Sequence, residues 1–302
     1  MTKIKEYEAI IIGGSYAGLS AAMALGRSLR NVLVIDSGLP CNRQTPHSHN
    51  FITQDGERPA AIASKAREQV LRYQTVTSVN DLATSGKKAE NGFLITTKKG
   101  QALFGKKLIF ATGIRDLMPE IEGFAACWGI SVIHCPYCHG YEFRGKNTGI
   151  MANGEKAFHV ASLVYNLTNN ITILTSSKAE FTEEQRKKLD QHQIPIIQSK
   201  ISQIEHDDGQ VSNVVFEDGK KMRFDAVYAA VPFVQHCEIP FQFGCELTEQ
   251  GHLKVDQFQK TTVDGVFACG DNSSTMRSVA NAVSSGNMAG AAVNKALTEE
   301  EF

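Results

Sequence analysis

The sequence predicts an α/β fold in which one structural plan occurs twice. The plan is a buried strand, a glycine-rich turn, a helix, a second strand, a β-hairpin and a last buried strand. The first copy begins near residue 7 and the second near residue 149. Because a strand, a glycine turn and a helix in this order form the nucleotide-binding unit of Rossmann-like domains, the repeat predicts two such domains in tandem.

The first copy has short apolar runs of the kind that form strands buried on both faces. A Lys-Lys-Gly turn between two apolar runs predicts its hairpin, and the acidic Asp36 ends its second strand. The predicted elements are strands at 7–12, 32–35 and 108–110, a helix that includes 19–25, and a hairpin of 93–97 with 101–104.

The second copy follows the same order, and the tail after it adds one more strand and a helix rich in small residues. The segment 182–185 reads Thr-Glu-Glu-Gln, a capping box that predicts the start of a charged surface helix. The predicted elements are strands at 149–151, 171–174, 227–231 and 265–268, a helix that ends near Leu167, a hairpin of 214–216 with 222–224, and a last helix to about Ala296.

Length and composition limit the classes of protein to consider. A chain of 302 residues predicts two domains. Its 31 Lys and Arg against 32 Asp and Glu give no basic surface for nucleic acid or an anionic membrane. No apolar run is long enough for a membrane span and no signal peptide is visible, so we expect a cytoplasmic protein. Seven cysteines, an odd number, argue against a secreted disulfide framework.

The turn at 13–18 is the first candidate site. It reads Gly-Gly-Ser-Tyr-Ala-Gly, a G-x-G-x-x-G fingerprint whose middle glycine is Ser15. Such a turn lets the backbone approach a pyrophosphate, which then sits at a helix N-terminus. Asp36 stands about 20 residues later, where an acid accepts hydrogen bonds from a ribose. A glycine-rich turn in an unrelated α/β fold is the alternative, but the context favours dinucleotide binding.

The segment Cys135-Pro136-Tyr137-Cys138-His139-Gly140 is the second candidate site. Two cysteines at C-x-x-C spacing can form a reversible disulfide with one reactive thiolate. A zinc knuckle is an alternative, but a structural zinc site needs four ligands and no second C-x-x-C is present. The other alternative is a pair of unrelated core thiols. We favour redox chemistry.

Polar residues near the C-terminus form a third candidate. Gly270 and Asp271 follow a buried-type strand, at the edge where open α/β sheets bind ligands. Arg277 and the stretch 278–282 then open a helix whose N-terminus could face an electron-rich ring. A plain strand-to-loop turn is the alternative.

Together these motifs resemble the low-molecular-weight thioredoxin reductases of the pyridine nucleotide-disulfide oxidoreductase superfamily. Along the chain, the motifs follow the order of that family: the first fingerprint, Ala111-Thr112-Gly113, the C-x-x-C, a second fingerprint and Gly270-Asp271. The resemblance covers nearly the whole chain. The resemblance implies a discontinuous FAD domain, at 1–115 and 241–302, and an inserted NAD(P)-type domain at 116–240. The FAD-binding residues it implies are Gly13, Ser15, Ala17, Gly18, Asp36, Ala111, Thr112, Gly113, Gly270, Asp271, Arg277, Ser278 and Val279.

The resemblance also implies roles for the two cysteines and a set of partners. Cys138 would lie against the flavin, and Cys135 would exchange with a substrate sulfur. The substrate would be a thioredoxin-like protein or a small dithiol or disulfide. Relatives of this type are homodimers with a mobile nucleotide domain, so we expect a homodimer.

The sequence departs from the family where NAD(P)H would bind. The second fingerprint reads Ala152-x-Gly154-x-x-Ala157, so its first glycine is lost. Residues 175–178 read Thr-Ser-Ser-Lys, in place of the basic cluster that pairs with the 2′-phosphate of NADPH. NADPH selectivity is therefore unsupported, and NAD(P)H remains an open donor.

The motif around the cysteines also departs, because His139 replaces the usual aspartate. Cys-Pro-Tyr-Cys-His-Gly is similar to fungal dithiol oxidases of epidithio-metabolite pathways, a branch of the same superfamily. Those flavoenzymes pass electrons from a dithiol to oxygen, and a ferredoxin is a further carrier to consider. His139 next to the pair could move the thiol proton, or it could merely cap a helix or turn. A flavoprotein redox sensor without turnover is the rival from another class.

The remaining histidines and cysteines are harder to assign. Arg43, His47 and His49 form a polar loop, in which we favour surface histidines over a role at the flavin edge. His236 and Cys237 lie at the predicted return crossing between the domains and could reach the dithiol in one conformation. We expect Cys41, Cys127, Cys245 and Cys269 to be packed thiols.

Overall fold

The computed structural model describes residues 4–302, which form two compact units. Unit 1 contains the chain up to Arg43, then Asn50–Arg115 and Phe233–Phe302. Unit 2 contains Gln44–His49 and Asp116–Pro232. Each unit has a sheet in which most strands are parallel, together with helices, which confirms the α/β class. The functional division at residues 115 and 240 stays a prediction.

Unit 1 is built on a seven-stranded sheet with the order β3-β2-β1-β6-β5-β4, in which β17 also pairs with β6. β1, β2, β3, β6 and β17 are parallel to one another, and β4 and β5 add an antiparallel edge. β17 pairs with the second half of β6, where β5 has ended. The strands are β1 (Lys5–Ile12), β2 (Val32–Asp36), β3 (Val76–Asn80), β4 (Ala83–Ala89), β5 (Gly92–Thr97), β6 (Ala102–Phe110) and β17 (Val266–Ala268).

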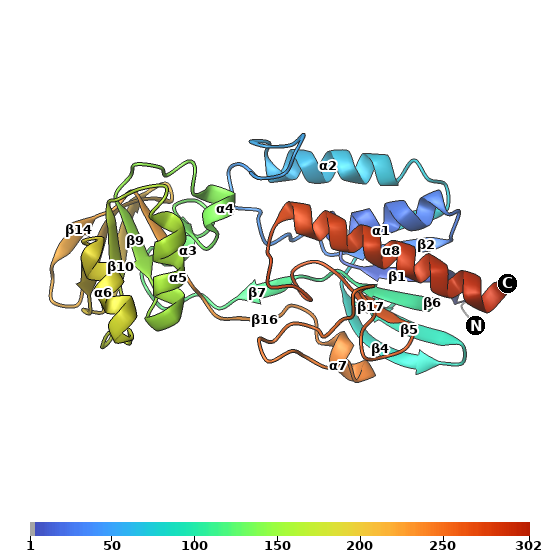
Figure 1. Cartoon of the computed structure of the whole chain (residues 1–302). Helices are drawn as coiled ribbons and strands as arrows, with labels where there is room; N and C mark the ends of the chain where they lie inside the picture. Colours follow the sequence, from blue (N-terminus) through green and yellow to red (C-terminus); the bar gives the residue numbers. More distant parts are fainter. Residues whose placement is uncertain (1–3) are drawn as a thin grey trace. The chain divides into compact units, whose positions relative to one another are not determined.

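Helices α1 (Tyr16–Arg27) and α8 (Val279–Glu301) lie side by side on this sheet (Figure 1). Small residues allow the close approach. A Cβ at Gly286 would fall 2.1 Å from the carbonyl oxygen of Ala17, and one at Gly290 would fall 2.6 Å from that of Ala21. Apolar side chains of both helices pack with those of β1 and β2 in one core. The other helices of unit 1 are α2 (Pro59–Val70) and α7 (Ile239–Phe243).

Unit 2 contains a five-stranded parallel sheet with the order β11-β10-β9-β15-β8. A separate three-stranded antiparallel sheet has the order β12-β13-β14. The strands are β8 (Val132–Ile133), β9 (Thr148–Met151), β10 (Ile171–Leu174), β11 (Ile196–Ile197), β12 (Ile201–Asp207), β13 (Gln210–Phe216), β14 (Lys221–Arg223) and β15 (Ala226–Ala229). The helices are α3 (Phe124–Cys127), α4 (Pro136–His139), α5 (Gly154–Val164) and α6 (Glu183–Gln191).

The chain passes between the units through two further strands, β7 (Ile114–Asp116) and β16 (Phe233–Gln235), which pair with each other. This pairing keeps the two connecting segments together. Within residues 4–302, no helix is both long enough and apolar enough to cross a membrane.

Most predicted elements are present, with differences at their ends. Both hairpins are confirmed, and Thr182 and Gln185 form the predicted capping box at the start of α6. The separate strand predicted at 108–110 is wrong, because one strand, β6, continues through the hairpin to Phe110. The second unit's first helix ends at Val164 rather than near Leu167. The C-terminal helix continues to Glu301, five residues beyond the prediction.

Candidate active site and cofactor site

The carboxyl ends of four parallel strands of unit 1 meet at one edge of its sheet. β1, β2, β6 and β17 are neighbours in parallel register, so the segments that follow them lie close together. The structure brings to this edge most of the residues that the sequence assigned to a dinucleotide, namely Gly13, Ser15, Ala17, Gly18, Asp36, Ala111, Thr112, Gly113, Gly270 and Asp271.

The glycine turn after β1 is closed by its own backbone contacts. Gly13 has φ +105°, and a Cβ there would fall 2.2 Å from the carbonyl oxygen of Ala111. A Cβ at Gly18 would fall 1.8 Å from the carbonyl oxygen of Gly13. The first and last glycines of the fingerprint therefore let α1 start directly against β1 and β6.

The N-terminus of α1 is open to an anion. Its N-cap is Ser15, whose side chain makes no capping hydrogen bond, and no acidic residue lies in the first turn. The unpaired N–H groups and the helix dipole there favour a pyrophosphate. Asp36 lies beside the turn, where its Oδ1 accepts a hydrogen bond from the Gly14 N–H at 3.1 Å.

Asn272, which the sequence analysis did not single out, joins two of the segments at this edge. It is fully buried, and its Nδ2 donates to the carbonyl oxygen of Phe110 at 2.8 Å and to Thr112 Oγ1 at 3.3 Å. Its Oδ1 is buried with no hydrogen-bond partner in the structure. Its place directly after Gly270-Asp271 is the one signal that could have indicated it.

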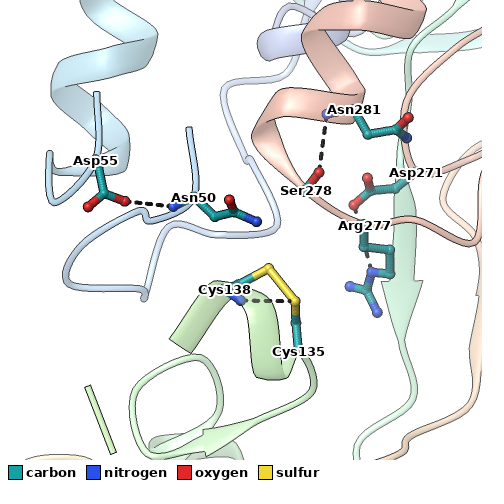
Figure 2. Close-up of a disulfide and its surroundings, with 8 residues drawn as sticks. All are labelled: Asn50, Asp55, Cys135, Cys138, Asp271, Arg277, Ser278 and Asn281. Carbon is teal, nitrogen blue, oxygen red and sulfur yellow. Dashed lines mark hydrogen bonds and ion pairs between the residues drawn. A yellow bond between two sulfur atoms is a disulfide. The ribbon is translucent and has the colours of Figure 1, made fainter. Parts of the chain in front are cut away.

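The start of α8 supplies the remaining predicted residues of unit 1. Arg277 Nε lies 3.7 Å from Asp271 Oδ2, and both side chains are mostly buried (Figure 2). Ser278 is the N-cap of α8 and accepts a hydrogen bond from the Asn281 N–H at 3.1 Å, and Val279 is the first helical residue. The open turn at α1, the acid at the end of β2 and the unpaired Asn272 Oδ1 together fit a bound dinucleotide.

In unit 2, Cys135 and Cys138 form a disulfide across the short helix α4 (Figure 2). Their Cα atoms are 5.3 Å apart, within the ordinary range for a disulfide. Cys135 follows β8 and is the N-cap of α4, with Sγ accepting from the Cys138 N–H at 3.2 Å. Pro136 occupies the first helical position, where a missing N–H costs nothing. Tyr137, between the two cysteines in sequence, is 69% exposed, whereas Cys135 and Cys138 are partly buried.

Gly140 allows α4 to close against the rest of unit 2. A Cβ there would fall 2.3 Å from the carbonyl oxygen of Pro136 and 3.1 Å from the hydroxyl of Tyr228. Tyr228 comes from β15 and is 2% exposed. Burial and, to a smaller extent, the charge of Glu142 raise the pKa of Tyr228, which keeps this phenol protonated.

His139 is the last residue of α4, directly after the second cysteine. Both ring nitrogens are buried without a hydrogen-bond partner in the structure, so the alternative of a capping histidine is wrong. Burial lowers the pKa of His139, the charge of His49 lowers it further, and that of Glu142 raises it. A neutral imidazole with unpaired nitrogens beside a disulfide can accept a proton from a thiol.

The second fingerprint differs from the first because the chain's own side chains fill it. Asn153 is the N-cap of α5, and its Oδ1 accepts from the N–H groups of Gly154 at 2.8 Å and Glu180 at 3.0 Å. Its Nδ2 donates to the carbonyl oxygen of Lys178 at 2.9 Å. Glu155 adds a negative charge in the first helical turn. These residues do not fit a nucleotide pyrophosphate, because the cap takes a donor N–H and Glu155 repels a phosphate.

The other cysteines are separate from the disulfide. Cys127, Cys245 and Cys269 are buried, which confirms them as packed thiols, and burial raises the pKa of Cys269 to about 12. The same expectation is wrong for Cys41, which is exposed because it lies in the irregular stretch between β2 and α2. No group of three or more His, Cys, Asp and Glu side chains in residues 4–302 is arranged to hold a metal ion.

Two Rossmann-type units, one of which has a C-x-x-C disulfide, define the class of dinucleotide-dependent disulfide oxidoreductases. The chain belongs to the pyridine nucleotide-disulphide oxidoreductase family, whose model matches residues 7–286. It is a thioredoxin reductase-like flavoprotein oxidoreductase, and the family implies FAD as the cofactor.

Relatives in sequence and in structure cover nearly the whole chain. A thioredoxin reductase of Claviceps purpurea, tcpT, is 33% identical over 300 residues, which cover 94% of this chain and 92% of the relative. The crystal structure of an oxidoreductase from Agrobacterium tumefaciens has a TM-score of 0.91 at 35% identity, covering 97% of this chain and 99% of its own. The crystal structure of a putative thioredoxin reductase, TrxB, from Bacillus anthracis has a TM-score of 0.93 at 28% identity. The match covers 98% of this chain and 100% of that one.

Proposed function

We propose that the protein is an FAD-dependent dithiol–disulfide oxidoreductase whose Cys135–Cys138 pair exchanges with a thioredoxin-like protein or a small dithiol. The observation that carries this proposal is the partly exposed Cys135–Cys138 disulfide, followed directly by His139 with two unpaired ring nitrogens. Thiol–disulfide exchange needs a sulfur that the substrate reaches and a group that moves a proton, and we assign these roles to Cys135 and His139.

The exchange proceeds in two steps on the chain's own residues. A substrate thiol gives its proton to His139, and the resulting thiolate attacks Cys135 Sγ. The Cys135–Cys138 bond breaks, and its electron pair leaves on Cys138 as a thiolate. The second substrate thiol then displaces Cys135 from the mixed disulfide. Two electrons have moved from the substrate dithiol to the cysteine pair; one proton is on His139 and the second is taken by the released Cys135, while Cys138 remains a thiolate.

FAD, when bound, supplies the two-electron acceptor that returns the cysteine pair to the disulfide. We propose that Gly13, Ser15, Ala17 and Gly18 hold its pyrophosphate at the start of α1. Asp36 would bind the ribose, and the other predicted contacts come from the segments after β6 and β17 and from the start of α8. These are Ala111, Thr112, Gly113, Gly270, Asp271, Arg277, Ser278 and Val279.

We further propose that electrons do not come from NAD(P)H. The specific observation is Asn153, which ties the start of α5 to Lys178 and Glu180 where a nucleotide would bind. Without that donor the reaction runs in the direction of dithiol oxidation, and oxygen or a ferredoxin takes the electrons. This assignment agrees with the resemblance of Cys-Pro-Tyr-Cys-His-Gly to fungal dithiol oxidases.

An anaerobic titration of the purified holoenzyme tests the donor. We expect a yellow flavin spectrum that dithiothreitol bleaches and that air restores. NADPH and NADH, added separately, should leave the spectrum unchanged over the same time. Rapid bleaching by NADPH at micromolar concentration would overturn the second proposal and leave the first intact.

Serine variants test the two cysteine roles. Cys135→Ser leaves Cys138 as a free thiolate, so a thiolate–flavin charge-transfer band should appear, whereas Cys138→Ser should not produce it. Each variant should lower dithiol turnover by about 10³-fold or more, since the disulfide can no longer form. Charge-transfer bands of equal strength in both variants would contradict the assignment.

A further inference from the structure

A second histidine lies near the dithiol turn, on a segment remote from it in the sequence. Residues 44–49 belong to unit 2, although the chain on both sides of them belongs to unit 1. Gln44 Nε2 donates to the carbonyl oxygen of Ala125 at 3.3 Å. Thr45 Oγ1 packs over Gly129, where a Cβ would meet it at 3.1 Å. These contacts attach the segment to unit 2 and bring His49, its last residue, to that unit.

His49 meets the acid that follows the dithiol turn. Its Nε2 lies 3.6 Å from Glu142 Oε1, and the side chains are 20% and 37% exposed. Glu142 comes three residues after His139, and both Glu142 and His49 act electrostatically on the His139 ring. An acid and two imidazoles therefore lie within electrostatic reach of one another, and His139, which directly follows Cys138 in the sequence, has no hydrogen-bond partner on its ring.

We propose that His49 and Glu142 form a carboxylate–imidazole pair that serves proton transfer at the dithiol site. His139 exchanges the proton with the reacting sulfur. His49 is a positioning residue: it orients the Glu142 carboxylate, and its own charge acts on the His139 ring. When a substrate thiol passes its proton to His139 and attacks Cys135, the carboxylate faces the new imidazolium and His49 holds that carboxylate in place. The inference rests on the dithiol chemistry proposed above.

The two members of the pair act on His139 with opposite sign. His49 in its protonated form lowers the pKa of His139, and the negative charge of Glu142 raises it. The other polar groups nearby are His47, whose ring centroid is 6.5 Å from that of His49, and Tyr228, whose pKa the charge of Glu142 helps to raise. Arg144 lies over the ring of Tyr141 at 4.0 Å.

The test is an NMR titration of the His139 ring in the oxidised holoenzyme, together with the pH profile of the anaerobic reduction by dithiothreitol. His49→Gln should move the His139 inflection to higher pH, and Glu142→Gln should move it to lower pH. The acid limb of the reduction rate should move in the same two directions. At a pH on that limb, each variant should change the rate by about two- to tenfold.

Control variants separate this role from a structural one. His49→Lys places a positive charge at the same position, so the His139 inflection should stay close to its wild-type pH. His47→Gln, at an exposed position on the same segment, should leave it in place. Gln44→Ala removes only the hydrogen bond to Ala125, so this variant should also leave the His139 inflection at its wild-type pH.

Three results would overturn the inference. They are inflections that move in the same direction in His49→Gln and Glu142→Gln, no movement in either, or a Gln44→Ala variant that reproduces His49→Gln. The ring titration needs no turnover, so it tests the pair even if dithiothreitol fails to reduce the wild-type flavin. That failure would overturn the proposed function instead.

Discussion

The starts of α1 and α5 occupy equivalent places in the two Rossmann-type units, yet they are built differently. At α1 the cap Ser15 leaves its side chain free of any capping bond, and no acid lies in the first turn. At α5 the cap Asn153 bonds to Gly154 and to the loop after β10, and Glu155 lies in the first turn. One helix start can receive an anion, and the other is satisfied by its own chain.

The difference continues at the end of the second strand of each unit. In unit 1 this strand ends with Asp36, which faces the glycine turn and accepts the Gly14 N–H. In unit 2 the strand is followed by Thr175, whose hydroxyl donates to the carbonyl oxygens of Ser177 and Ile197. Both units therefore share the strand–turn–helix topology, but in unit 2 the start of the helix makes its hydrogen bonds within the chain. A shared fold therefore does not imply a shared ligand site, and the side chains at each turn decide what it can bind.

Among substitutions at the two turns, we expect the largest loss of stability and of bound flavin at Gly18. Gly18→Ala places a Cβ against the carbonyl oxygen of Gly13, so α1 has to shift away from the turn. We expect destabilisation by about 3 kcal/mol and loss of most of the bound flavin. Denaturant unfolding and the flavin-to-protein absorbance ratio measure the two effects.

The matched control lies at the equivalent position of the second turn, which is already Ala157. Ala157→Gly should cost about 2 kcal/mol, because it places a glycine inside a helix and removes a buried methyl group, and it should leave the flavin content unchanged. Equal flavin loss in both variants would mean that the two turns do not differ as proposed.

A smaller effect is expected at Asp36. Asp36→Ala removes the acceptor of the Gly14 N–H and the carboxylate proposed for the ribose. A lost hydrogen bond to a charged group should weaken FAD binding by about tenfold to a hundredfold, measured by flavin fluorescence on adding FAD to the apoprotein. Thr175→Ala, at the corresponding place in unit 2, should leave FAD affinity unchanged, and an equal loss there would contradict the assignment.

Opening the second turn should have a smaller effect again. Asn153→Ala removes the cap of α5 and its bonds to Lys178 and Glu180, which should cost about 1–2 kcal/mol of unfolding free energy. Flavin content and dithiol turnover should stay at the wild-type level, because this turn is not part of the proposed flavin site. A fall in flavin content that matched the Asp36→Ala variant would argue that both turns serve the cofactor.

The sequence was informative about the fold wherever local patterns determine structure. Alternation, turn residues and the capping box at Thr182 predicted both hairpins and the start of α6, because each depends on neighbouring residues. Strand β12 was missed, since its residues at 201–207 mix polar and apolar side chains and are defined by pairing with β13. The continuity of β6 through Gly105 likewise depends on its long partner β1.

The site was predictable only where a motif reports it. Cys135, Cys138 and the glycine turn belong to short patterns with a direct physical reason. Asn153, by contrast, acts through bonds to residues 25 and 27 positions away, and His49 reaches Glu142 across 93 positions. Spacing within the sequence contains no information about such contacts, because they depend on how the segments fold back on one another.

The smallest effect concerns one buried histidine in each unit. Burial lowers the pKa of His139 in unit 2 and of His252 in unit 1, where the charge of Arg277 lowers it further. A folded-state pKa below the unfolded value means that folding favours the neutral ring. This contribution to stability is present above the unfolded pKa of about 6.5 and is lost as the pH falls through the folded pKa.

The urea midpoint of the wild type should therefore fall between about pH 7.5 and about pH 5, beyond the change due to other groups. His252→Gln and His139→Gln should each reduce that fall, whereas His159→Gln, at an exposed position on α5, should not. Since His252 packs against the Phe233 ring, at 4.7 Å between ring centroids, its variant is compared at both pH values so that lost packing cancels. A fall that is unchanged in both variants would show that neither ring loses stability on protonation. A reduction in only one variant would locate the pH sensitivity of the fold in that unit.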